Sequence, residues 1–388
     1  MTLIFDNRYK GHHFEYVKHL IDYLKTGEGY IFLLHPNVIK RLEGHYPSER
    51  IASFRIEPFP EVSENFSFLK RIYEESCILR KIVKDYKISH LIFMFLDAYQ
   101  LVIGLKYLQQ VKLSGILFFP PIQLTSVSVG QQLKADLKKW RKLKQLQWCV
   151  GNAALQSIFI LQDKRSPLLL NKKFKTDIFR TIVEPIGCPF PLVKEATCPS
   201  FFPELHEFEG KFIGLVFGSI SEFKNIPNLL QAIQLLPTKY REEIVLLIVG
   251  PYASLKDESI IESLIQQNKD ITILRLNRFI EKGEAIQELF NRSSVILMPY
   301  INFYGSSGVL GHAAKNRKLV LTPNEGIIAD LVYQYQLGVT CTPASINSLT
   351  ESLLELLLNY SVFEERARFE DFLTGRTPEL FASTLLNN

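Results

Sequence analysis

Residues 300–326, YINFYGSSGVLGHAAKNRKLVLTPNEG, decide the fold predicted for this chain. They follow a short apolar run, residues 294–298, which has the length of a strand and stops at Pro299. A turn rich in glycine and serine at 305–308 then opens a helix-forming segment and leads to a second apolar run at 319–322. Such a turn presents unpaired backbone N–H groups and the positive end of a helix dipole. The stretch therefore predicts a strand, a helix and a strand, with a site for an anion such as a nucleotide diphosphate at the start of the helix. An ordinary β-α turn without a ligand has the same local signals.

Length and composition indicate a well-packed globular protein. A chain of 388 residues is too long for one typical core, so two domains are expected. The hydrophobic fraction of 47% and charged fraction of 22% argue against disorder. The five cysteines show no metal-ligand spacing and predict reduced thiols, with no disulfide framework and no metal site. No apolar run approaches the ~18 residues needed to span a bilayer, and a cytoplasmic location is expected.

Charge is distributed unevenly along the chain. Residues 1–200 carry 29 lysines and arginines against 18 acidic residues, a net charge of +11. Residues 201–388 carry 16 against 22, a net charge of −6. This asymmetry favours two domains with different partners.

The first half alternates strand-like and helix-like segments, which predicts a parallel, doubly wound α/β sheet. The predicted strands are residues 3–5, 30–34, 51–56, 90–96, 115–119, 157–161 and 181–186. The predicted helices are residues 12–24, 66–87, 99–110 and 130–146. Ligands of such sheets bind beyond the carboxyl ends of the strands.

Two of these strand ends carry candidate acceptor-side residues. A turn and helix start with Gly11, His12 and His13 follow the first strand. The alternative for the histidines is a helix cap with solvated side chains. Asp97 follows the fourth strand and could cap the next helix or bind a hydroxyl of an acceptor.

The predicted helix 130–146 is amphipathic and strongly basic. Leu133, Leu137, Trp140 and Leu143 form one stripe with six lysines and arginines around it. This pattern is typical of a helix that lies on an anionic membrane surface. The alternative is an ordinary surface helix with a basic outer face. No nucleic-acid-binding module accompanies it, so nucleic acid is not an expected partner.

A proline-rich segment separates the two halves. Five prolines fall between residues 184 and 204, where they exclude regular structure and indicate a connection between domains. A second alternation follows it. We therefore predict an N-terminal domain at 1–187, a linker at 188–210 and a C-terminal domain at 211–388, whose last helix could pack on the first domain.

Residues 304–320 resemble the donor-site segment of the retaining GT-B glycosyltransferases of family 4, the group 1 glycosyltransferases. That family typically reads E-G-F-G-L-V-L-L-E-A-x-A-x-G-K-P-V, where this chain reads Y-G-S-S-G-V-L-G-H-A-A-K-N-R-K-L-V. Tyr304 and His312 stand where the family has two glutamates. The matching positions are Gly305, Val309, Leu310, Ala313, Lys318 and Val320.

Three further segments carry the resemblance in the right order. The family pattern G-R-x-x-x-x-K-G-x-x-x-L-L-x-A is similar to residues 218–232, with Gly218 and Lys224 retained and Ser219 in place of the arginine. Gly250 ends a strand as in the family, and residues 320–330 resemble its last glycine-containing element. The dinucleotide fingerprint G-x-G-x-x-G is absent after the first strand of either half, which argues against a dehydrogenase.

The resemblance implies two tandem Rossmann-like domains with the active site in a cleft between them. It further implies a hexosyltransferase that moves a sugar from a nucleotide-diphosphate sugar to a glycan or lipid-linked acceptor, with retention and with neither metal nor cofactor. Lys224, His312 and Asp97 are the catalytic candidates. The predicted donor-binding residues are Gly218, Ser219, Lys224, Tyr304, Gly305, Ser306, Ser307, Gly308, Val309 and His312. The alternatives are a catalytically silent homologue that binds sugar nucleotide or glycan, and a sugar epimerase of the same fold.

Overall fold

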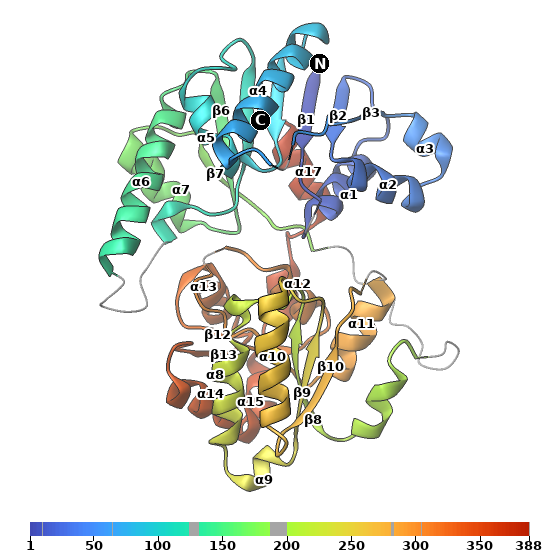
Figure 1. Ribbon diagram of the computed structural model, residues 1–388, viewed down its shortest axis with the longest axis vertical. Helices are drawn as coiled ribbons and strands as arrows, with labels where there is room; N and C mark the ends of the chain where they lie inside the picture. Colours follow the sequence, from blue (N-terminus) through green and yellow to red (C-terminus); the bar gives the residue numbers. More distant parts are fainter. Residues whose placement is uncertain are drawn as a thin grey trace. The chain divides into compact units, whose positions relative to one another are not determined.

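The computed structural model describes residues 1–9, 11–63, 65–123, 132–186, 200–280, 283–303 and 305–387. The chain divides into two compact units (Figure 1). Unit 1 comprises Met1–Pro185 together with Gly375–Asn388, and unit 2 comprises Ile186–Thr374. Most of the predicted linker, including Cys188 and Cys198, lies outside the described residues. The described part of the linker includes Phe202 and Leu205, which are buried in the core of unit 2.

Unit 1 is built on a seven-stranded parallel sheet of order β3-β2-β1-β4-β5-β6-β7. Its strands are β1 (Thr2–Asp6), β2 (Tyr30–Leu34), β3 (Arg55–Pro58), β4 (His90–Phe93), β5 (Lys112–Leu117), β6 (Leu155–Leu161) and β7 (Phe179–Ile182). The order reverses between the neighbours β1 and β4, which places the topological switch point beyond their carboxyl ends.

Helices cover both faces of this sheet, because successive strand residues point to opposite sides. Leu3 and Phe5 of β1 join one buried cluster, and Ile4 joins the other. The first cluster takes side chains from α4 (Phe68–Asp85), α5 (Gln100–Gly104), α6 (Gln132–Val150) and α7 (Arg165–Phe174). The second takes side chains from α1 (His13–Tyr23), α2 (Pro36–His45) and α17 (Pro378–Leu386). The short helices α3 (Ser48–Ala52), η1 (Leu96–Ala98) and η2 (Pro121–Gln123) complete the described part of the unit.

The helix α17 closes unit 1 although it follows unit 2 in the sequence. It packs along α1, and in Figure 1 its red ribbon lies beside the blue one of α1. Phe381, Ala382 and Leu385 are fully buried, and the Phe381 ring lies 5.1 Å from that of Tyr16. Burying two large apolar side chains contributes roughly 3–6 kcal/mol before conformational entropy is counted. Residues 375–388 are therefore part of the core of unit 1.

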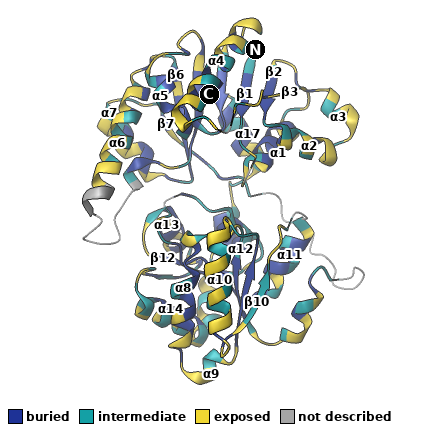
Figure 2. Ribbon diagram, in the orientation of Figure 1, coloured by how far each residue is buried: buried dark blue, intermediate teal, exposed yellow. Residues whose placement is uncertain are grey.

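Unit 2 contains a six-stranded parallel sheet of order β10-β9-β8-β11-β12-β13. Its strands are β8 (Phe212–Phe217), β9 (Ile244–Val249), β10 (Thr272–Leu276), β11 (Val295–Leu297), β12 (Leu319–Pro323) and β13 (Gly338–Cys341). Every residue of β9 is buried, as expected for a strand covered on both faces (Figure 2). The switch point of this sheet lies between β8 and β11.

The helices of unit 2 alternate with these strands and share one buried core with them. They are α8 (Ile226–Gln234), α9 (Thr238–Arg241), α10 (Leu255–Gln267), α11 (Gly283–Arg292), α12 (Gly308–Lys315), α13 (Gly326–Tyr335), α14 (Ile346–Leu358), α15 (Tyr360–Arg366) and α16 (Phe369–Leu373), with η4 (Pro203–Phe208) and η5 (Glu222–Lys224). Two parallel α/β sheets confirm the predicted fold class.

Two predicted boundaries of unit 1 are wrong. Ile51 and Ala52 end the helix α3, so the third strand begins only at Arg55. The helix predicted at 99–110 ends at Gly104, and the chain continues in turns. The first apolar run thus belongs to a short helix rather than to a strand, and the second forms a shorter helix than predicted. Among the described residues, no helix has the length and apolar character needed to cross a membrane.

Candidate functional site

The predicted donor residues lie on two loops at the switch point of unit 2. One loop follows β8 and contains Gly218 and Lys224, and the other follows β11 and leads into α12. The backbone N–H of Ile301 donates to the carbonyl of Phe223 at 3.0 Å, which joins the two loops directly. Because β8 and β11 are neighbours in a parallel sheet, their carboxyl ends bring these loops together.

Lys224 is buried and has a defined position. Only 3% of its surface is exposed. Its Nζ donates hydrogen bonds to the carbonyl oxygen of Phe217 at 2.6 Å and to the hydroxyl of Tyr300 at 2.9 Å. Burial lowers the pKa of Lys224 to about 7, and no described carboxylate contributes to its pKa. An ammonium has three N–H donors, so one remains for a ligand.

The structure explains why two positions that match the family pattern, 218 and 250, are glycines. Gly218 has φ of +100° and follows the carbonyl that binds Lys224. A Cβ built on Gly250, whose φ is +134°, would lie 2.0 Å from the carbonyl oxygen of Gly218. Only glycine allows this approach of two backbones at the carboxyl ends of β8 and β9. Ser219, at the family's arginine position, is exposed.

The backbone N–H groups at the start of α12 are not capped by a side chain of the N-cap residue. Ser307 is the N-cap residue in an extended conformation, and its side chain does not cap the helix. The N–H groups of Gly308 and Val309 have no acceptor within the helix, because they belong to its first turn. Gly305 is buried, and Ser306 is half-buried. Tyr304 lies outside the described residues.

His312 lies in the wall of this site. It is half-buried on α12, with its ring 6.5 Å from that of Phe217 and 5.5 Å from that of Phe290. Phe217 therefore contacts both candidates, since its carbonyl accepts from Lys224 and its ring faces His312. The structure brings Lys224, Gly218 and His312 together around the end of β8.

The acceptor-side candidates of unit 1 lie at its own switch point. His13 begins α1 and its Nδ1 hydrogen-bonds the carboxylate of Asp6 at 2.8 Å, at the end of β1. Its ring lies 5.9 Å from Phe95 and 6.0 Å from Phe118. Gly11 and His12 are exposed. His13 is therefore not a solvated histidine, whereas the side chain of His12 is exposed.

Asp97 does not cap a helix, so that interpretation is wrong. The N-cap residue of α5 is Tyr99. The carboxylate of Asp97 instead accepts hydrogen bonds from the backbone N–H groups of Phe118 at 2.8 Å and Phe119 at 3.1 Å. Burial raises the pKa of Asp97 to about 6, against the lowering effect of these bonds and of Lys142. Asp97 therefore holds the loop after β5 at the same edge of the sheet.

Sequence reasoning missed a buried carboxylate near this edge. Glu75 of α4 is 4% exposed and accepts hydrogen bonds from the Tyr99 hydroxyl at 2.5 Å and from the Asn7 amide at 3.0 Å. Asn7 follows β1 directly, so the carboxylate helps to fix the loop that carries His13. The only sign of this role in the sequence was that Glu75 is a polar residue on the buried side of the predicted helix.

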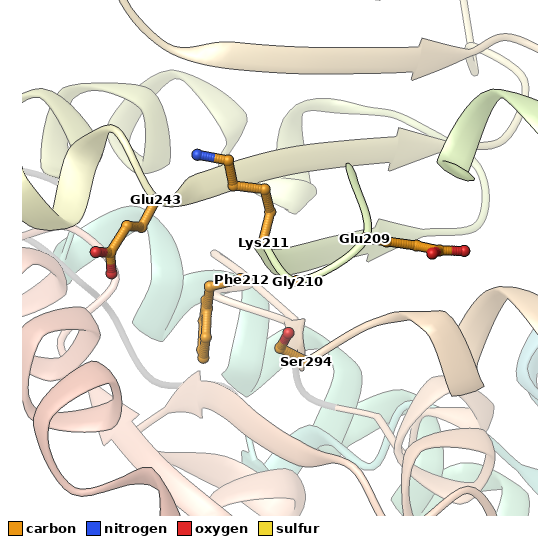
Figure 3. Close-up of a pocket in the computed structure, with 6 residues that line it drawn as sticks. All are labelled: Glu209, Gly210, Lys211, Phe212, Glu243 and Ser294. Carbon is orange, nitrogen blue, oxygen red and sulfur yellow. The ribbon is translucent and has the colours of Figure 1, made fainter. Parts of the chain in front are cut away.

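A separate surface hollow lies away from all of these residues. It has a volume of about 590 Å³ and lies at the amino ends of β8 and β9, opposite the ends that carry the donor candidates (Figure 3). Its lining residues are Glu209, Gly210, Lys211, Phe212, Glu243 and Ser294. None of the predicted site residues lines it.

The helix α6 has an exposed apolar stretch among basic residues. Residues 130 and 131 and the side chain of Leu133 lie outside the described part. Leu137 and Trp140 are 65% and 58% exposed, whereas Leu146 and Cys149 are fully buried. The second half of α6 thus packs on unit 1, and so does Leu143 of the predicted stripe, whereas Leu137 and Trp140 are presented to solvent.

The comparisons with known proteins agree with this geometry. Residues 199–372 match the family described as glycosyl transferases group 1. The fold is similar to that of Alr3699/HepE from Anabaena, solved with UDP, at 13% identity and a TM-score of 0.65, covering 100% of this chain and 97% of that one. It is also similar to WaaG, a glycosyltransferase of lipopolysaccharide biosynthesis, at 16% identity and a TM-score of 0.67, covering 100% of both chains. Sucrose-phosphate synthase from Thermosynechococcus elongatus aligns at 15% identity and a TM-score of 0.65, covering 99% of this chain and 95% of that one.

The two sheets and the loops at their switch points define a GT-B fold. Residues 199–372, which make up most of unit 2, thus match the group 1 glycosyltransferases, a family whose members take their sugar from a nucleotide-sugar donor and typically act with retention. No protein of curated function matches the sequence significantly.

Proposed function

We propose that this protein is a retaining, metal-independent hexosyltransferase that moves a sugar from a nucleotide-diphosphate sugar to a glycan or lipid-linked acceptor of a cell-surface polysaccharide or glycoconjugate. The observation that carries this proposal is the pairing of a buried ammonium, Lys224, with the open amides that begin α12. Both positive features face the switch point of one sheet. A dianionic leaving group is the ligand that such an arrangement suits.

Unit 2 would hold the donor. Charge builds on the leaving diphosphate as the bond to the sugar breaks, and Lys224 and the amides of Gly308 and Val309 stabilise that charge most in the transition state. The ring of His312 would hydrogen-bond a hydroxyl of the sugar, because a neutral imidazole has one donor and one acceptor. That two of the similar structures contain UDP and UDP-glucose supports a donor of this class.

Unit 1 would hold the acceptor. His13, oriented by the Asp6 carboxylate, is the group best placed to accept a hydrogen bond from an acceptor hydroxyl. Asp97 contributes by fixing Phe118 and Phe119, and the lone pairs that remain on its oxygens can still accept a hydroxyl.

A thermal-shift panel of UDP, GDP, ADP and their sugars tests the donor proposal. A ligand at about 100 times its Kd stabilises a protein by about 2.7 kcal/mol, which raises Tm by several degrees. We expect this shift for the diphosphates of one base and a similar shift for the corresponding sugar, both unaffected by EDTA. No shift with any diphosphate would contradict the proposal. Binding without release of nucleotide in the presence of glycan acceptors would instead indicate a catalytically silent homologue.

We also propose that α6 binds an anionic membrane surface, where a lipid-linked acceptor would be found. Leu137 and Trp140 are exposed, and so are Lys138 and Arg141, so apolar contact and charge attraction act in the same exposed stretch of the helix. Each basic residue near such a surface contributes about 1 kcal/mol.

Sedimentation with anionic liposomes tests this surface. Replacing Trp140, Lys138, Lys139 and Arg141 by neutral polar residues should weaken binding by about 3 kcal/mol or more, and high salt should weaken binding of the wild type. The matched control neutralises Lys172, Lys173 and Lys175, which are exposed in the same unit, and should retain most of the binding. Equal sedimentation with neutral and anionic vesicles would leave only an ordinary surface helix.

A further inference from the structure

Tyr300 is a buried tyrosine at the centre of the two donor loops. It lies three residues beyond the end of β11 and is 3% exposed. Its hydroxyl oxygen accepts the hydrogen bond from Lys224 Nζ at 2.9 Å. The side chain of Ser307, the N-cap residue of α12, lies close enough to this hydroxyl to lower its pKa, against the larger raising effect of burial. Tyr300 thus lies near both the buried ammonium and the start of the helix.

The ring of Tyr300 is fixed by aromatic neighbours from both loops. It lies 5.2 Å from Phe223 at an interplanar angle of 81°, and 5.2 Å from Phe303 at 72°. Phe223 and Phe303 also stack on each other at 5.4 Å. Edge-to-face contacts of this kind hold a ring in one orientation. The hydroxyl therefore cannot move away from Lys224 without disturbing three packed rings.

We propose that Tyr300 is a positioning residue, whose hydroxyl holds the Lys224 ammonium in place at the diphosphate site. This inference rests on the proposed donor site. The carbonyl of Phe217 holds a second N–H of Lys224, so the two acceptors together fix the direction of the third. A lysine alone is a flexible point charge, and the pair of acceptors turns it into a directed donor.

The surroundings of Lys224 show why its acceptors matter. The end of β8 supplies the Phe217 carbonyl and the loop after β11 supplies Tyr300, while His312 lies against the Phe217 ring. Burial lowers the pKa of Lys224, and no described carboxylate opposes this effect. A hydroxyl oxygen stabilises the charged form by accepting a hydrogen bond from it. Removing the Tyr300 hydroxyl should therefore lower the pKa of Lys224 further.

The test compares Tyr300→Phe with Tyr360→Phe. Both variants lose one hydroxyl in unit 2, but the hydroxyl of Tyr360 donates to the carbonyl of Ser294, at the amino end of β11. Titration with the nucleoside diphosphate that binds the wild type should show about a tenfold loss of affinity for Tyr300→Phe only. The pH above which binding declines should move down by about one unit in the same variant. Wild-type affinity and an unchanged pH profile would overturn the proposal.

A second measurement does not depend on the donor. NMR of the protein labelled at lysine Cε, with the Lys224 signal identified by its loss in Lys224→Met, reports the titration of Lys224 directly. Tyr300→Phe should lower that titration midpoint by about one pH unit, and Tyr360→Phe should leave it unchanged. An unchanged midpoint in Tyr300→Phe rejects the positioning role. A shifted midpoint in a protein that binds no diphosphate would keep that role and reject the proposed donor site instead.

Ser307→Ala provides a variant that leaves all three rings in place. It should weaken diphosphate binding while keeping the Lys224 midpoint of the wild type, because it removes only the contact on the helix side of Tyr300. A shift of the midpoint as large as that in Tyr300→Phe would contradict the assignment of Lys224 to the Tyr300 oxygen.

Discussion

Lys224→Met is expected to abolish most sugar transfer and at the same time to make the protein more stable. Losing one group that stabilises charge in the transition state costs about 3–4 kcal/mol, which lowers turnover by two orders of magnitude or more. The stability change has the opposite sign because the ammonium is buried without a carboxylate partner. Methionine fills a similar volume and carries no charge.

The pH dependence of this gain follows from the two pKa values of Lys224. Its pKa is about 7 in the folded protein and 10.5 in the unfolded chain. Between these values the unfolded chain binds more protons, so the stability of the wild type rises with pH. Below about pH 7 Lys224 is protonated in both the folded and the unfolded state. The full cost of burying its charge then lowers the stability of the wild type, by about 5 kcal/mol at most. The variant also leaves the Phe217 carbonyl and the Tyr300 hydroxyl without this donor, at about 1–3 kcal/mol, so a net gain of about 2 kcal/mol is expected.

Chemical denaturation at about pH 6 and about pH 10 checks the stability of Lys224→Met, and release of nucleotide checks its turnover. The gain should be present at the lower pH and replaced by a small loss of stability at the higher one, where the charge penalty is nearly gone and the loss of the two hydrogen bonds remains. Lys256→Met replaces an exposed lysine of α10 in the same unit and should change neither quantity. Wild-type turnover in Lys224→Met, with the donor known, would remove Lys224 from the site.

Gly308→Val is expected to abolish binding of the nucleoside diphosphate. Gly308 is the first residue of α12, and a branched side chain there would cover the open amides of the turn. We expect a loss of at least two orders of magnitude, on the scale seen when a backbone or amide donor to an anion is removed. Gly283→Val, at the first residue of α11, is the matched control and should bind normally. Normal binding by Gly308→Val would place the anion site elsewhere.

His312→Ala is expected to weaken binding of the nucleotide sugar without changing binding of the bare nucleoside diphosphate. His312 lies one turn into α12, beside Phe217, where it can reach a sugar but is not among the open amides. Isothermal titration should show unchanged binding of the bare nucleoside diphosphate and weaker binding of the nucleotide sugar. Equal loss for both ligands would mean that His312 supports the fold of α12 through Phe290 rather than the sugar.

The sequence predicted the fold through strong, repeated signals. Strands covered on both faces, such as β9, appear as uninterrupted apolar runs, and the glycines at 218 and 250 mark backbones that approach within contact. The weak points were short elements. The strand Gly338–Cys341 was not predicted, because four residues with a glycine give little periodicity.

The candidate site was predicted only in part, because tertiary partners decide what a polar residue does. Lys224 was recognised through the resemblance to the family pattern, and the turn before α12 through its place after a strand. The role of Tyr300 could not be, since its hydrogen bond to Lys224 joins residues 76 positions apart. Asp97 was expected either to cap the next helix or to bind an acceptor hydroxyl, but its observed partners lie more than 20 residues away, at Phe118 and Phe119. Local rules describe caps and turns, and these contacts depend on strand order.

The placement of α17 has a consequence for synthesis on the ribosome. The first 185 residues of unit 1 are made long before residues 375–388, which complete its core. At about 5–20 residues per second, the intervening segment takes on the order of 10–40 s to translate. Throughout that time the nascent unit leaves open the apolar surface that Phe381 and Leu385 later cover. Until the last helix arrives, this exposed apolar surface makes the growing chain prone to aggregation.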